Sequence, residues 1–555
     1  MQQSLLSGII KVVREERMVT MKLVFCGACH EVTGSCYYIE ACNKKILVDY
    51  GLEQGVNVYE SGKVPVPLSD IDYVFLTHAH IDHSGKLPLL AAEGFNGRIF
   101  STVATMNLCG IMLQDSAHIQ EVEAEWDNRK RRRAGKVEIP PLYTVEDALS
   151  ILNNFEGYRY GEIISVCDGI QIRFIDAGHL LGSASIEIYL TENGVTKKLL
   201  FSGDIGNTDR PLIRNPMPAS DADYIIMEST YGDREHGMVP DYVKSLSNVI
   251  RRTFERGGNV VIPSFAVGRT QEMLYYMRQI KDDPKNRDLG DFPVYLDSPL
   301  AIEATGIYEE SANREYFDEE ALSLLEKGID PIKFSGLNLS ITSEQSKEIN
   351  FNEEPKVIIS ASGMCDAGRI KHHLKHNLWR PECTILFVGY QANGTLGRAL
   401  TEGCKQVKIF GDEIDVEAEI CQLSGLSAHA DVNGLKNWIS NIERKPERVF
   451  VCHGEDTVCD AFADRLSYEM NLNAMAPYPY ASIDIGTGII LTEGNREKIK
   501  KKEKSSIVSP KSPYGRLLLA MKRLETVVKH NEGGANKDLA KFTDQLIALC
   551  DKWDR

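Results

Sequence analysis

The sequence lacks any apolar run as long as the roughly 18 residues that a membrane-spanning helix requires. Its first 20 residues alternate charged and apolar side chains, and they contain no cleavable secretory pattern. From these two absences we expect a cytoplasmic location and no membrane partner.

An excess of positive charge is also missing. The 555 residues include 63 Lys and Arg against 79 Asp and Glu, which gives a formal net charge of −16. A protein of this sign does not coat nucleic acid by bulk attraction, so contact with a polyanion has to come from local basic patches. Residues 129–133 and 498–504 form two such patches, and a solvated surface is the alternative interpretation of each.

The cysteines do not form an even, closely spaced set. Thirteen are scattered along the chain, which predicts reduced thiols rather than a disulfide framework. Cys26, Cys29 and His30 match the C-x-x-C-H pattern of covalent haem attachment. That attachment needs an exported, oxidising setting, and here the segment runs into a glycine-containing loop that feeds a strand, so we expect no haem.

The most informative residues follow a short β-branched and aromatic run at 72–76, which predicts a buried strand. Directly after it come His78, His80, Asp82 and His83, whose imidazoles and carboxylate suit zinc or manganese better than calcium. In extended chain His78 and His80 point the same way and can share one ion. Asp82 and His83, beyond the bend, can face a second ion. The alternative is a polar loop that happens to carry histidines. Chance rarely places three of 13 histidines within six positions in this order, which disfavours that alternative.

This His-x-His-x-Asp-His pattern resembles the metal motif of the metallo-β-lactamase fold, an α/β hydrolase of four αββα layers with a two-metal site between its sheets. Asp49, at the end of a predicted strand, matches the family's first motif, an aspartate that supports the histidines. His179 and Asp204 match the third and fourth motifs, and the family's Asp204 equivalent bridges both ions. The resemblance therefore implies two zinc ions, with manganese as a substitute.

A second resemblance distinguishes this chain from lactamases and lactonases. A strand ends at Glu228, an inserted α/β region follows, and the landmarks in that region resemble the β-CASP cap that marks nucleases of the superfamily. Two later motifs of that family are also present, with His429 matching motif B and His453 matching motif C. A histidine at motif C is associated with RNA substrates. The chain is most similar to bacterial ribonucleases akin to the nuclease subunit of the pre-mRNA 3′-end cleavage machinery.

The two resemblances imply a role for each matched residue. One zinc would be held by His78, His80, His179 and Asp204, and the other by Asp82, His83, Asp204 and His453. The predicted catalytic residues are Asp204, Glu228, His429 and Asp49, with the pair of Glu228 and His429 supplying a proton to the departing ribose oxygen. Substrate phosphate is assigned to Ser427, Ser362, Gly363 and Arg269, although ordinary strand-to-helix connections also explain the glycine-rich turns of the cap.

The function expected from this pattern is zinc-dependent hydrolysis of single-stranded RNA in RNA processing or decay. Internal cleavage is the first choice, and 5′-3′ exonuclease activity by the same residues stays open. A thioesterase or lactonase of the same fold is the alternative enzyme, but it leaves Glu228, the insertion and His429 unexplained. A scaffold without activity is disfavoured because every ligand position is filled.

A chain of this length exceeds one hydrophobic core, so several domains are expected. Helical spacing of apolar residues near the end, around Gly533, predicts a hairpin that suits docking or homodimer formation. His372, His373 and His376, interleaved with lysines, predict an exposed basic helix face rather than a metal site.

The predicted boundaries are an N-terminal extension at 1–20, the lactamase-like domain at 21–232 and 424–494, the cap at 233–423, a basic linker at 495–512 and a helical extension at 513–555.

Overall fold

The computed structural model describes residues 21–55, 58–218, 220–237, 240–392, 394–423, 425, 427–499, 513–533 and 535–553. Two compact units divide the chain, Met1–Lys498 and Ile499–Arg555. The predicted N-terminal extension and most of the predicted basic linker lie outside the described residues.

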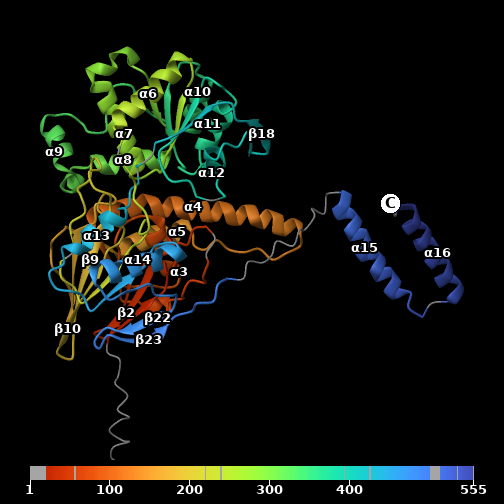
Figure 1. The fold of residues 1–555 in the computed structure, drawn as a ribbon, viewed down its shortest axis with the longest axis horizontal. Coiled ribbons are helices and arrows are strands. Elements are labelled where there is room, and N and C mark those ends of the chain that lie inside the picture. Colours follow the sequence, from red (N-terminus) through yellow and green to blue (C-terminus); the bar gives the residue numbers. More distant parts are fainter. Residues whose placement is uncertain are drawn as a thin grey trace, which may run out of the picture. The chain divides into compact units, whose positions relative to one another are not determined.

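The first unit is built on two sheets that pack face to face (Figure 1). One sheet has eight strands in the spatial order β23 (Ile489–Glu493), β22 (Ala481–Asp484), β1 (Lys22–Phe25), β2 (Cys36–Ala41), β3 (Lys44–Tyr50), β4 (Tyr73–Phe75), β5 (Arg98–Thr102) and β6 (Phe155–Tyr158). The other has seven, in the order β21 (Ala474–Met475), β20 (Arg448–Val451), β11 (Tyr224–Met227), β10 (Val195–Phe201), β9 (Ala184–Glu192), β8 (Ile170–Asp176) and β7 (Ile164–Cys167).

Alternating side chains fill the space between these sheets. In β8, Ile170, Ile172 and Phe174 are buried while Gln171 is exposed, because successive strand residues point to opposite faces. They pack in one core with residues of the first sheet such as Phe75.

Helices cover the outer face of each sheet. On the first sheet these are α2 (Ile81–Ser84), α3 (Leu87–Ala92), α4 (Val103–Arg133) and α5 (Val145–Ile151), and on the second they are α13 (Val432–Ser440) and α14 (Asp456–Met470). The resulting order of helix, sheet, sheet and helix confirms the predicted four-layer sandwich.

The strand directions determine where the connecting loops meet. Strands β3, β4 and β5 run parallel, as do β10, β11 and β20, and β8 runs with β10 because β9 is antiparallel to both. Parallel strands end at the same edge of their sheet, so the loops after these strands share one rim of each sheet.

An inserted α/β cap follows β11, as predicted. Its six-stranded parallel sheet has the order β14 (Leu337–Leu339), β13 (Val294–Leu296), β15 (Val357–Ser360), β12 (Val260–Pro263), β16 (Thr384–Phe387) and β19 (Glu419–Gln422). A two-stranded ribbon, β17 (Gln406–Ile409) and β18 (Asp412–Asp415), stands apart. The α-helices of the cap are α6 (Tyr242–Glu255), α7 (Arg269–Asp282), α8 (Pro299–Glu309), α9 (Glu319–Glu326), α10 (Ser343–Phe351), α11 (Ile370–Asn377) and α12 (Leu396–Thr401).

One predicted feature of the cap is wrong. His373 of α11 is fully buried, whereas the sequence suggested that it lies on an exposed basic face with His372 and His376. Its Nε2 lies 2.6 Å from Oδ2 of the buried Asp297, and its Nδ1 lies 2.9 Å from Oδ1 of Asn350. The helix turns this position toward the sheet, and a buried carboxylate there needs hydrogen-bonding partners.

The Asp297 carboxylate is accordingly expected to stabilise the cap. Burial raises its pKa, but hydrogen bonds from His373, Ser346 and Arg369 outweigh burial and lower the pKa to about 2. Replacing Asp297 by alanine removes these bonds and leaves buried donors unpaired, so we expect a loss of about 3–5 kcal/mol in the free energy of unfolding. The contribution of the carboxylate is complete above its unfolded pKa of about 4 and is lost as the pH falls toward 2. Denaturant unfolding of Asp297→Ala and of wild type at pH 7 measures the difference in the free energy of unfolding. A difference below about 1 kcal/mol contradicts a stabilising role for the Asp297 carboxylate.

The second unit consists of two helices, α15 (Pro513–His530) and α16 (Asn536–Trp553), which confirms the predicted helical extension. Its exposed large apolar residues include Leu517, Met521, Ile547 and Trp553. Across the described residues of both units, no helix combines the length and the apolar character that spanning a membrane requires.

Candidate metal centre

The shared rim of the two sheets gathers the polar residues singled out in the sequence. Asp49 lies at the end of β3, and the His78 to His83 stretch follows β4. From the second sheet, the loops after β8, β10, β11 and β20 supply His179, Asp204, Glu228 and His453, and the loop before α13 supplies His429.

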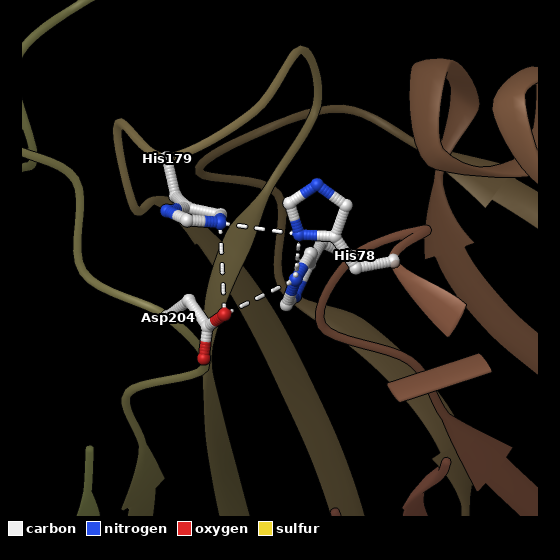
Figure 2. A group of neighbouring side chains, drawn as sticks. His78, His179 and Asp204 are labelled. Atoms are coloured by element: carbon white, nitrogen blue, oxygen red, sulfur yellow. Dashed lines mark hydrogen bonds and ion pairs between the residues drawn. The ribbon is translucent and has the colours of Figure 1, made fainter. Parts of the chain in front are cut away.

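Four ligand-type side chains converge in a first cluster. The His78 Nε2 lies 3.1 Å from the His80 Nδ1, which lies 3.2 Å from the His179 Nε2. The Oδ2 atom of Asp204 is 3.5 Å from the His78 Nε2 and 3.6 Å from the His179 Nε2. Figure 2 shows His78, His179 and Asp204 turned toward one another. One ligand atom from each of the four residues lies within 4.8 Å of all the others.

A second cluster lies on the other side of the same carboxylate. The Oδ1 atom of Asp204 is 3.2 Å from the His83 Nε2 and 3.6 Å from the His453 Nε2. The two imidazole nitrogens are 3.2 Å apart, and the Asp82 Oδ2 lies 3.5 Å from the His453 Nε2. Each oxygen of Asp204 therefore faces a different group of histidines.

These donors fit a transition-metal ion in each cluster. Ligands about 2.1 Å from a tetrahedral zinc lie about 3.4 Å from one another, which is close to the separations found here. Asp204 Oδ1 is buried, and although the His83 Nε2 lies 3.2 Å away, the oxygen accepts no well-aligned hydrogen bond, a costly state that a bound cation relieves. Burial and neighbouring imidazoles hold the pKa of His78 and of His179 well below the ordinary value, so both rings are neutral, the form that binds metals.

Asp49 orients the ring of His83. Its Oδ2 lies 2.7 Å from the His83 Nδ1, and its two oxygens accept hydrogen bonds of 2.8 Å from the Thr77 backbone N–H and hydroxyl. With Nδ1 held in this way, the Nε2 atom of His83 points into the second cluster. A carboxylate in this position fixes the tautomer of a metal-binding imidazole and raises its basicity.

Glu228 and His429 form a separate pair beside Asp204. The His429 Nδ1 lies 3.1 Å and 3.2 Å from the two carboxylate oxygens of Glu228. A hydrogen bond joins the loop that carries His429 to the loop after Asp204: the Ala430 N–H donates to the Ile205 carbonyl at 2.8 Å. Burial alone lowers the pKa of His429, but the charges of Glu228 and Asp204 outweigh it and raise the pKa to about 9. The ring is thus protonated at neutral pH, with its Nδ1 occupied and its Nε2 left for other contacts.

The predicted phosphate contacts are spread over the structure. Ser427 lies two residues before His429, and its hydroxyl accepts from the His429 backbone N–H at 3.3 Å. Ser362 and Gly363 lie after β15 in the cap, and among the described contacts none joins them to the histidine clusters. Arg269 is only 8% exposed and pairs with Glu272, so the geometry weighs against a phosphate contact by Arg269.

Sequence reasoning missed Arg210, six residues after Asp204. Its Nη1 donates to the carbonyl oxygens of His179 at 2.6 Å and Ala428 at 3.3 Å, and its guanidinium pairs with Glu272 of cap helix α7 at 2.5 Å. The side chain thereby connects the cap to the two loops that carry His179 and His429. No sequence motif marks it, because its three partners are distant along the chain.

Replacing Arg210 by methionine is expected to misplace both loops and lower kcat about 10- to 100-fold, because small displacements of reacting groups have effects of that size. Arg214→Met is the matched control, since Arg214 bonds instead to the carbonyls of Glu315 and Phe317. Steady-state kinetics of both variants provide the measurement. Equal effects of the two substitutions would contradict a positioning role for Arg210.

Three protein-family descriptions match this chain. They are the metallo-beta-lactamase superfamily over residues 31–153, the Beta-Casp domain over 270–400 and the Zn-dependent metallo-hydrolase RNA specificity domain over 413–477. Together they match parts of both the sandwich and its inserted cap, and residues 154–269 lie outside the three matches.

Individual proteins are similar over most of this chain. Ribonuclease TTHA0252 of Thermus thermophilus is 34% identical over 440 residues, covering 79% of this chain and 94% of that protein. The RNase J-like protein of Methanocaldococcus jannaschii is 31% identical over 470 residues, covering 83% of this chain and 98% of that protein. Transcription termination factor FttA of Methanosarcina mazei is 30% identical over 465 residues, covering 81% of this chain and 69% of that protein.

Proposed function

The chain belongs to the β-CASP family of the metallo-β-lactamase superfamily, and from this premise we propose that it is a metal-dependent ribonuclease that cleaves single-stranded RNA internally. Two relatives that align over nearly their whole length bear the names ribonuclease and RNase J-like protein. We place the reaction in the cytoplasm, where free thiols such as the 13 cysteines of this chain stay reduced.

The observation that carries the proposal is the position of Asp204 between two histidine clusters. In the proposal, His78, His80, His179 and Asp204 hold one zinc, and Asp82, His83, Asp204 and His453 hold the other, with manganese as a substitute. When bound, such a pair of ions lowers the pKa of a shared water to about 7 and stabilises the oxygens that attack and leave phosphorus.

The residues of the chain then divide the remaining tasks. Asp49 keeps the His83 ring in the orientation that binds a metal. Glu228 holds His429 in its protonated form, and the free Nε2–H of His429 gives a proton to the departing ribose oxygen as its bond to phosphorus breaks. Ser427, beside His429, is placed to contact a phosphate oxygen of the bound strand.

A turnover assay tests the proposal directly. Fluorescent RNA is expected to be cleaved, cleavage is expected to stop with EDTA, and zinc or manganese is expected to restore it. A thioester substrate serves as the comparison for the alternative thioesterase or lactonase activity. Turnover of the thioester without turnover of RNA would replace the proposal by that alternative.

The direction of cleavage needs its own experiment. RNA labelled at the 5′ end in one reaction and at the 3′ end in another gives intermediate fragments from both labels when cuts are internal. Release of single nucleotides from the 5′ label alone indicates 5′-3′ exonuclease activity instead. Blocking the 5′ end with a hairpin leaves internal cleavage intact and stops the exonuclease.

A further inference from the structure

Helix α4 extends far beyond the core that it covers. Its buried residues end at Ala117, apart from the single residue Asn128 near its carboxyl end. Figure 1 shows this end of the helix projecting past the two sheets of the first unit. We name residues 119–142, the end of α4 and the segment after it, the α4 arm.

The α4 arm is braced along its own length. The side-chain amide of Asn128 donates to the Ile139 carbonyl at 2.8 Å, and its oxygen accepts from the Ile139 N–H at 2.9 Å. The Arg131 Nε donates to the Val137 carbonyl at 2.6 Å. These bonds hold the returning segment against the helix, so the surface is ordered before any ligand binds.

The tip of the α4 arm concentrates positive charge in a chain whose net charge is −16. Within residues 128–137 there are six cations and no acidic residue: Arg129, Lys130, Arg131, Arg132, Arg133 and Lys136. The acids on either side of this stretch, Asp127 and Glu138, form exposed ion pairs with Lys130 and Arg132. The dipole of α4 favours the four cations of its last turn, Lys130 to Arg133, but it does not explain Arg129 before that turn or Lys136 beyond the helix. The pairs that Arg129 and Arg132 make with Glu125 are exposed, and such pairs contribute at most about 1 kcal/mol, so both cations are available to phosphate.

An aromatic ring accompanies these cations. Trp126 is 61% exposed, and the Lys130 Nζ lies 3.1 Å from the centre of its ring. Exposed aromatic faces beside cationic grooves are the usual way in which proteins hold single-stranded nucleic acid, because bases stack on the ring while the cations contact the backbone. The combination favours RNA over an acidic protein, which has no need of a stacking surface.

The other end of α4 contacts the loop that carries His179. The hydroxyl groups of Thr102 and Thr105, at the start of the helix, donate to the Gly182 carbonyl at 2.6 Å and 2.9 Å, and Gly182 lies three residues after His179. The 31 residues of the helix correspond to about 46 Å at 1.5 Å per residue. At about 3.4 Å per nucleotide, a stacked strand covers that length with about 14 nucleotides.

We propose that the α4 arm is a second binding surface for the RNA that is cleaved at the Asp204 clusters, engaged only by strands that extend about 14 nucleotides or more beyond the cut. This inference rests on the proposed ribonuclease function. The α4 arm increases the affinity for long substrates through phosphate contacts and base stacking, and it leaves the chemical step unchanged.

The test uses the full-length chain carrying Arg129→Ala, Arg132→Ala and Arg133→Ala together, because Arg131 braces the α4 arm and is left in place. KM for a 30-nucleotide RNA is expected to rise about tenfold, with kcat unchanged and with no change for an 8-nucleotide RNA. Binding of the 30-mer, measured by fluorescence anisotropy, should depend less steeply on salt, by about 0.7 in log–log slope for each phosphate that the variant no longer neutralises. Trp126→Ala should weaken binding of the 30-mer without changing the salt slope.

The control removes three cations that lie elsewhere. Lys197 lies near the start of β10, and Arg444 and Lys445 precede β20, at the rim opposite the metal centre. Their replacement by alanine changes the net charge equally. The inference is overturned if the control variant weakens binding of the 30-nucleotide RNA as much as the α4 arm variant does. It is also overturned if the α4 arm variant binds and cleaves both RNAs like wild type. If the wild type cleaves neither RNA, the proposed function fails, and the anisotropy measurement still decides whether the α4 arm binds RNA.

Discussion

Asp204→Ala is expected to lower kcat for RNA cleavage at least about 10³-fold and to reduce the bound metal from the two equivalents that we propose for the wild type to below one. The reason is geometric, because each oxygen of this carboxylate faces a different histidine cluster at 3.2–3.6 Å. Loss of the bridge therefore weakens both sites together. Several kcal/mol of transition-state stabilisation is expected from the two ions, and every 1.36 kcal/mol corresponds to a tenfold change in rate.

Elemental analysis of purified protein measures the metal independently of activity. Asp209→Asn is the matched control, since Asp209 is exposed on the same loop and its carboxylate accepts a hydrogen bond from the Asn215 side-chain amide at 3.4 Å rather than facing a histidine. Wild-type metal content in Asp204→Ala would show that the carboxylate is not a shared ligand. Loss of metal in the Asp209 control would show that the loop, and not the bridge, is responsible.

His429→Ala is expected to lower kcat about 10²- to 10⁴-fold while both metals stay bound. General acids contribute rate factors of this size, and the hydrogen bonds of His429 to Glu228 leave its Nε2 free to donate. Glu228→Gln removes the negative charge that keeps the ring protonated, so a smaller loss of kcat is expected from that variant. Elemental analysis beside steady-state kinetics distinguishes this role from metal binding.

A modified substrate makes the test of His429 more specific. An RNA whose departing ribose oxygen is replaced by sulfur needs little protonation of the leaving group, so its cleavage should be nearly equal in wild type and His429→Ala. An equally large defect with this substrate would exclude a role as general acid. Loss of one metal equivalent in His429→Ala would identify the residue as a ligand, which its place near Asp204 and Glu228 makes a real alternative.

Local spacing explains why so much of this arrangement was predictable. His78, His80, Asp82 and His83 lie within six positions, and the turn after β4 that presents them follows from a short apolar run and the bend beyond it. Family resemblance added Asp49, His179, Asp204 and His453, which lie on separate loops, and the structure brings all of them to one rim. The ligand roles of His179, Asp204 and His453, and the supporting role of Asp49, are predictions that a measurement of bound metal tests.

The features that were missed depend on partners far away in sequence. His373 looks like part of a basic helix face until the fold places Asp297, 76 residues earlier, against it. Arg210 has no motif, yet it reaches the loops of His179 and Ala428 and the cap residue Glu272. Arg269 was assigned to phosphate because it follows a strand that ends in a turn with serine and glycine before a helix, and only its buried pairing with Glu272 argues against that assignment.

The amino-acid sequence alone determined the alternation that forms the strands and the order of imidazoles and carboxylates along the chain, since both depend on residues within a turn or a strand of one another. Tertiary structure alone decided which buried charges pair, how the cap is tied to the metal centre and that the carboxyl end of α4 projects with its cations exposed. The physical reason is that burial and ion pairing depend on the distance between side chains in space, and residues separated by tens or hundreds of positions acquire that distance only when the sheets and helices pack.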